Sequence, residues 1–154
     1  MREIKFRAYI KEDYNEELVG KMLDVSSIHL KTGKVIIGYS LRNSNYGNKS
    51  FLYKNIELMQ YTGLHDKNGK EIYEGDIIKK VFYKYSNDEF GHKGFYELIC
   101  KIIWQDGLGF TFRKIRENEI EMPEEYREPY DEVIGNIYEN SNLLKGADNI
   151  LWKY

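Results

Sequence analysis

Apolar and polar residues alternate along much of the chain, and this pattern predicts strands. In residues 4–10 every second side chain is apolar, which is typical of a strand with one buried face. The same period is clearest in residues 95–104, where one face carries Tyr96, Leu98, Cys100, Ile102 and Trp104. No long amphipathic helix is visible. We therefore predict a mainly β protein, of the β-rich α+β class.

Further apolar segments predict the remaining strands, at residues 22–25, 28–30, 34–41, 58–61, 77–83, 110–115 and 133–138. Asn68-Gly69 is a strong hairpin signal, because both residues tolerate the positive φ of a tight turn. Two polar stretches predict loops instead. One is residues 42–50, rich in Asn, Ser and Gly, and the other is the acidic stretch 116–132.

The chain of 154 residues is long enough for one ordinary domain or two small ones. A short charge-poor link near Lys54-Asn55 is the candidate boundary. We predict a β-rich N-terminal region over residues 1–54 and a second domain over residues 55–154 that contains the acidic loop 116–132.

Cys100 is the only cysteine, which excludes a disulfide within the chain and a zinc site built on several cysteines. Its place on the apolar face of residues 95–104 predicts a buried thiol rather than a nucleophile. The N-terminus lacks an apolar signal segment, and no apolar run approaches the length of a membrane span. We expect a cytoplasmic protein without membrane contact.

Several motifs resemble the YopX family of phage and prophage proteins. They are the opening residues 1–9, residues 60–64 and 66–77 around the Asn68-Gly69 turn, and residues 133–140. The resemblance extends over nearly the whole chain. It implies a phage or prophage origin, hence a bacterial host cell, and a second domain similar to an SH3-like barrel. We assign the apolar segment 58–61 as the first strand of that barrel. It carries over no catalytic residue.

Motifs for catalysis are not found in the sequence, so we expect no enzyme activity and no cofactor. Ser27 and His29 share a strand face, but a catalytic triad requires geometry rather than proximity. Asp66, Glu71 and Asp76 offer oxygen ligands, so a divalent-metal-dependent hydrolase is a second alternative function. The turn-rich hairpin favours solvated turn residues over a metal site.

Charge is unevenly distributed. Residues 1–60 carry ten Lys or Arg and seven Asp or Glu, a balance of +3; residues 61–154 carry thirteen and eighteen, a balance of −5. No acidic residue occurs from Val25 to Ile56. Basic and aromatic side chains alternate there, and such side chains bind phosphates and stack on bases. The candidate binding residues are Arg42, Tyr46, Lys49 and Lys54.

These observations favour a non-enzymatic phage accessory protein that acts through protein–protein contacts, with another phage or host protein or with itself as a homo-oligomer. The opposed charges of the two halves favour self-association. A nucleic-acid-binding module that uses residues 31–54 is the first alternative.

Overall fold

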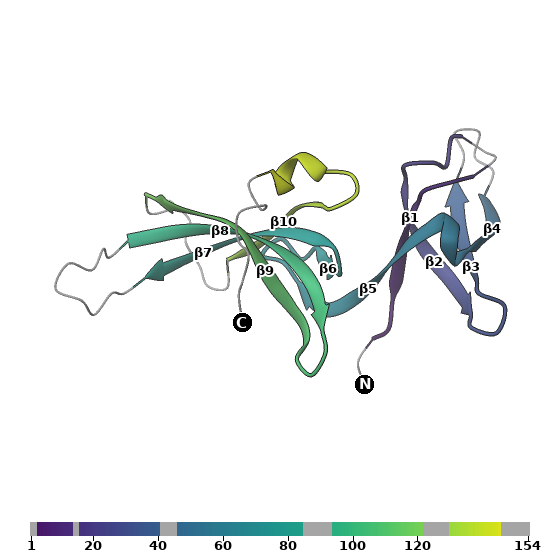
Figure 1. Ribbon diagram of the computed structural model, residues 1–154, viewed down its shortest axis with the longest axis horizontal. Coiled ribbons are helices and arrows are strands. Elements are labelled where there is room, and N and C mark those ends of the chain that lie inside the picture. The colour runs from purple at the N-terminus through teal and green to yellow at the C-terminus, as the bar shows by residue number, and fades with distance from the viewer. Residues whose placement is uncertain (1–2, 14–15, 41–45, 85–93, 122–129, 146–154) are drawn as a thin grey trace. The chain divides into compact units, whose positions relative to one another are not determined.

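The computed structural model describes residues 3–13, 16–40, 46–84, 94–121 and 130–145. It is mainly β, as the alternation predicts, and it contains two antiparallel sheets (Figure 1). The chain divides into two compact units, Met1–Gly63 and Leu64–Tyr154. In the described part of the chain we find no helix with the length and hydropathy of a membrane span.

The first sheet has six strands in the order β4-β3-β2-β1-β5-β6, and the first five form the sheet of the first unit. Its core contains Ala8, Ile10, Val35, Ile37 and Phe51, all on one face of the sheet. The elements are β1 (Phe6–Ile10), β2 (Met22–His29), β3 (Lys34–Ser40), β4 (Tyr46–Leu52), the 3₁₀ turn η1 (Tyr53–Asn55) and β5 (Ile56–His65).

The prediction of a loop over residues 42–50 is wrong for its second part, because β4 begins at Tyr46. Residues 46–52 pair in continuous register with β3, from Ser40 opposite Tyr46 to Lys34 opposite Leu52. The strand forms although Gly47 and Asn48 have low strand propensity, because Phe51 packs into the core and fixes the pairing. Residues 41–45 lie outside the described residues.

The segment 58–61, which was predicted to be the first strand of a barrel, belongs to β5 in the first unit. β5 pairs with β1 from Phe6 opposite Gln60 to Ile10 opposite Ile56. Ile56 is buried in the core of this unit and Leu58 packs against it. The division between the units therefore comes after Gly63, later than the predicted boundary after residue 54.

The second unit contains a sheet with the strand order β10-β7-β8-β9. Its long strands β7, β8 and β9 run side by side (Figure 1). One face buries Ile78, Cys100 and Ile102, and the other buries Ile77, Ile99 and Ile115. The elements are β6 (Glu71–Tyr73), β7 (Asp76–Lys84), β8 (Gly94–Gln105), β9 (Gly109–Ile120), β10 (Asp131–Asn136) and the 3₁₀ turn η2 (Ser141–Leu144).

β9 extends to Ile120, so the first residues of the predicted acidic loop 116–132 are part of a strand. They pair with β8, from Ile99 opposite Arg116 to Phe95 opposite Ile120. Residues 122–129 of that loop lie outside the described residues. Closure of the second sheet into an SH3-like barrel stays a prediction.

Candidate functional site

The structure separates the residues predicted to form a nucleic-acid site. Tyr46 and Lys49 lie on β4, and an odd spacing on a strand places them on opposite faces. Lys54 lies on η1 and is exposed. Arg42 lies outside the described residues. Tyr46 is 90% exposed, whereas Lys49 is half-buried, so the two side chains have different roles.

Lys49 is engaged on the core side of β4. Its ammonium group forms an ion pair with the carboxylate of Asp13, whose side chain is buried. The ammonium also lies 5.7 Å from the centre of the Phe51 ring. These contacts neutralise the charge of Lys49 within the first unit, which makes it unsuited to a phosphate contact. The ion pair joins Lys49 to Asp13, 36 positions earlier in the chain, so the sequence around Lys49 does not predict it.

The opposite side of this sheet, which we call the outer face, is polar and open to solvent. The register places its members opposite one another on β3 and β4, beginning with Gly38 opposite Asn48 and Ile36 opposite Ser50. The bulge between Val25 and Ser27 brings β2 into the same layer. Over β2, β3 and β4 the outer face includes Asp24, Ser26, Ser27, His29, Lys34, Ile36, Gly38, Tyr46, Asn48, Ser50 and Leu52.

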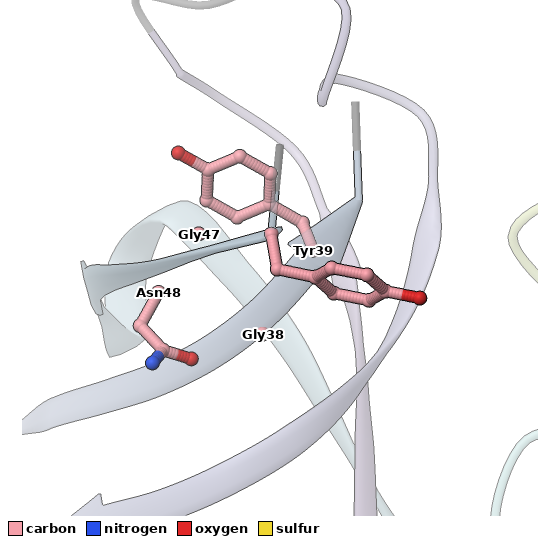
Figure 2. Close-up of a pocket in the computed structure, with 5 residues that line it drawn as sticks. Gly38, Tyr39, Gly47 and Asn48 are labelled. Carbon is pink, nitrogen blue, oxygen red and sulfur yellow. The ribbon is translucent and has the colours of Figure 1, made fainter. Parts of the chain in front are cut away.

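A hollow of about 480 Å³ lies at the end of β3 and β4, lined by Gly38, Tyr39, Tyr46, Gly47 and Asn48. Figure 2 shows the Tyr39 ring lying over Gly47 on one side of β4, with the Asn48 side chain on the other. A Cβ atom at Gly47 would lie 2.7 Å from Cζ of Tyr39. Only glycine therefore fits at position 47 while the Tyr39 ring stays in place.

Gly38 forms the floor of the outer face at this end. A Cβ atom there would lie 3.3 Å from Oγ of Ser26 and 3.4 Å from Oδ1 of Asn48. A hydroxyl and an amide from two different strands thus flank one position that has no side chain. The sequence pattern did not predict this group, although a glycine between β-branched residues and a tyrosine is a signal of close approach to the backbone.

Ser27 and His29, which share a face as predicted, lie with Oγ and Nε2 3.4 Å apart. Both side chains are exposed on the outer face. The pair adds hydrogen-bonding groups to this face.

The three carboxylates of the metal-site alternative each accept hydrogen bonds from the protein. Asp66 accepts from the backbone of Asn68, Lys70 and Val133 at 2.8, 2.9 and 3.0 Å. Oδ2 of Asp76 accepts from the Tyr73 backbone at 2.8 Å, and Oε2 of Glu71 accepts from the Tyr73 hydroxyl at 2.7 Å. Over the residues that the structure describes, no group of three His, Cys, Asp or Glu side chains is placed to hold a metal ion.

Cys100 is completely buried, which confirms the prediction of a core thiol. Burial raises the pKa of this thiol to about 12, and the nearby ammonium groups of Lys80 and Lys114 only partly oppose this. Because the thiolate is the nucleophilic form, Cys100 is inert at neutral pH.

The hairpin of β8 and β9 exposes apolar side chains at its end. Trp104 is 50% exposed, Leu108 72% and Phe112 47%. Trp104 and Phe110 face each other across the strands with their ring centres 5.0 Å apart, edge to face. These side chains continue the face that buries Cys100 and Ile102 into solvent, which makes the hairpin a second candidate contact surface.

Comparison with known proteins places the chain among relatives. The family model described as YopX protein matches residues 5–145. The chain is similar to the crystal structure of protein EF1440 from Enterococcus faecalis, with a TM-score of 0.53 and 25% sequence identity, covering 94% of this chain and 100% of that one. No curated protein matches the chain.

Proposed function

The chain belongs to the YopX family, and from this premise we propose that it is a non-enzymatic binding protein that self-associates through the edge strand β9. The family resemblance supports placing this function in the cytoplasm of a bacterial cell that carries a phage or prophage. One observation carries the proposal, namely the order of charges along β9.

β9 has a basic first half and an acidic second half. Arg113, Lys114 and Arg116 come first, and they are followed by Glu117, Glu119 and, just past the strand, Glu121. β9 is the last strand in the order β10-β7-β8-β9, so one of its edges faces away from β8. A strand edge of this kind is a template for pairing with another chain.

A second copy of β9, running antiparallel, would bring each basic half opposite the partner's acidic half. Opposite charges stabilise a strand pair where they lie on the same side of the sheet, and like charges there destabilise it. The register with β8 places Lys114 and Glu119 on the Cys100 side of β9, so these two charges can face each other across the symmetric pair, whereas Arg113 and Arg116 lie on the other side and act over a longer range. A parallel copy would place like charges together. The charge order therefore selects an antiparallel, two-fold symmetric pairing, which is the geometry of the commonest homodimers.

The exposure of the charged side chains agrees with this role. Arg113, Arg116 and Glu119 are exposed, whereas Lys114 and Glu117 are partly buried and pair with each other at 3.0 Å. Trp104 and Leu108, at the end of the β8–β9 hairpin, are exposed and are apolar side chains of the kind that interfaces use.

Charge reversal tests the proposal by analytical ultracentrifugation of the full chain. We expect the parent to be a dimer and two variants, Arg113→Glu/Arg116→Glu and Glu119→Lys/Glu121→Lys, to be monomers. An equimolar mixture of the two variants should form a heterodimer, because one edge is then acidic and the other basic. Lys21→Glu/Lys31→Glu changes the same amount of exposed charge in the first unit and should remain a dimer.

A parent that stays monomeric up to millimolar concentration would contradict the proposal. So would variants that dimerise as well alone as they do when mixed, because β9 would then not be the interface.

A further inference from the structure

The outer face of the first unit offers a binding site that is independent of β9. It is built on three strands whose opposite side packs into the core through Val35, Ile37 and Phe51. Side chains on such a face are held by a fixed backbone, and a site on strands is more precise than one on a loop.

Gly38 is the first feature that points to a ligand. Gly38 does not belong to the glycines with positive φ, so its backbone conformation is open to any residue. Glycine inside a strand weakens the strand, and it often marks a position where a ligand approaches the backbone closely. The groups that border the gap, Ser26 Oγ and Asn48 Oδ1, are hydrogen-bonding atoms rather than apolar packing.

Tyr46 is the second feature. Its ring is 90% exposed, and it shares a strand face with Asn48, two residues further along β4. The next residue, Gly47, is covered from the other side by the Tyr39 ring, which holds this part of β4 in place (Figure 2). A solvent-exposed aromatic ring beside an amide, on a strand whose backbone is held by pairing, is a stacking platform for a flat ring with a polar edge.

Charge is the third feature. β3 and β4 contain no Asp or Glu, and Lys34 lies on the outer face at the other end of β3. From Gly38 to Lys34 the strand extends about 13 Å, at roughly 3.3 Å per residue. Asp13, which pairs with Lys49, lies on the core side and so adds no negative charge beside Lys34.

From these features we infer that the outer face binds single-stranded nucleic acid, with one base stacked on Tyr46, its edge hydrogen-bonded over Gly38 by Asn48 and Ser26, and the phosphate backbone running along β3 toward Lys34. The amide of Asn48 both donates and accepts hydrogen bonds, and the hydroxyl of Ser26 does the same, so they suit the mixed edge of a base. This site keeps Tyr46 from the candidate binding residues predicted from the sequence. Ser26, Gly38 and Asn48, which lie on the same face as Tyr46, take the place of Lys49 and Lys54.

The test is fluorescence anisotropy with labelled oligodeoxythymidylate and oligouridylate of about 12 nucleotides, titrated with the full chain at low and moderate salt. We expect binding that weakens as salt rises, because phosphate contacts release counterions. Tyr46→Ala should weaken binding by roughly tenfold or more, and Tyr46→Phe should preserve it, because the ring provides the stacking surface.

Gly38→Ala separates binding from stability. The added methyl group would press on Ser26 and Asn48 and occupy the space over position 38 where the edge of the base binds. We therefore expect binding to weaken several-fold. The thermal midpoint should not fall, because alanine is the better strand residue and both neighbours are exposed enough to move. Phe112→Ala, which removes an exposed ring from the second unit, is the matched control and should bind as the parent does.

Absence of binding by the parent at low salt, or equal binding by the parent and Tyr46→Ala, would overturn the inference. The variant Arg113→Glu/Arg116→Glu separates this result from the proposed self-association, because it disrupts the dimer and should leave oligonucleotide binding in place.

Discussion

The carboxylate of Asp66 accepts a hydrogen bond at 3.0 Å from the backbone N–H of Val133, which lies 67 residues later in the chain. The other oxygen of the same carboxylate accepts from Asn68 and Lys70 and closes the turn between β5 and β6. Lys67 extends this contact, since its backbone N–H donates to the carbonyl of Asp131 at 2.8 Å. Two motifs that carry the family resemblance, residues 66–77 and 133–140, are therefore hydrogen-bonded to each other. We call the contacts of Asp66 and Lys67 with Val133 and Asp131 the joint.

Replacement of Asp66 by Ala should destabilise the protein, because three backbone N–H groups would lose their acceptor. Asp66 is only 7% exposed, so water replaces the carboxylate poorly. We expect a loss of about 1–3 kcal/mol in the free energy of unfolding, measured by urea denaturation. Asp24→Ala, at an exposed position on β2, is the control and should change stability little. Equal effects of the two substitutions would show that the joint contributes nothing.

Acid should unfold the protein partly through this joint. Burial opposes ionisation of Asp66, but the hydrogen bonds from Val133, Lys70 and Asn68 outweigh it and lower the pKa of the carboxyl. Hydrogen bonds from Lys67 and then Lys79 lower the pKa of Glu132 on the neighbouring β10.

For a group with a lowered pKa, the stabilisation is complete above the unfolded value, near 3.8 for Asp and 4.5 for Glu, and is lost as pH falls through the folded value. We therefore expect the contribution of Asp66 and Glu132 to the free energy of unfolding to be constant above about pH 5 and to decrease below it. Urea midpoints measured from neutral to acidic pH should show a smaller decrease for Asp66→Asn and Glu132→Gln than for the parent. A parent-like decrease in both variants would assign acid sensitivity to other carboxylates.

Cys100 should not react with thiol reagents in the folded protein. Its side chain is completely buried and the pKa of the thiol is raised to about 12, so little thiolate forms at pH 8 and the reagent has no access. With Ellman's reagent we expect no rapid phase in buffer and one full equivalent in urea. A rapid reaction in buffer would mean that the sheet between β7 and β9 opens readily.

The class of the fold and most strands were predictable, because alternation is a local signal. Residues 95–104 carry it without interruption, and β8 occupies nearly the same range with Cys100 and Ile102 buried as expected. β4 could not be predicted in this way. Its Gly47 and Asn48 are typical of loops, and the strand exists because β3 pairs with it and Tyr39 covers Gly47.

The candidate site could be predicted only in part for the same reason. Tyr46 was identified from composition, but its partners Ser26, Gly38 and Asn48 come from three strands, and their proximity depends on register and on a bulge in β2. Lys49 was named with Tyr46, yet its charge is matched by Asp13 on the core side. Sequence indicates which residue types are present, and the pairing of strands decides which of them share a face.

Gly135 allows a test of the close contact between Gly135 and Asn140 within residues 133–140. A Cβ atom there would lie 2.4 Å from Oδ1 and 2.7 Å from Cγ of Asn140, and that Oδ1 accepts a hydrogen bond from the backbone of Asn136 at 3.1 Å. Gly135→Ala must displace the Asn140 side chain and break this bond, so we expect a loss of about 1–3 kcal/mol in unfolding free energy. Adding Asn140→Gly to Gly135→Ala removes the clash, and the double variant should be no less stable than Asn140→Gly alone. If Gly135→Ala destabilises equally with or without Asn140, the cost arises from the bulge between Val133 and Gly135 in the pairing of β10 with β7 rather than from the contact with Asn140.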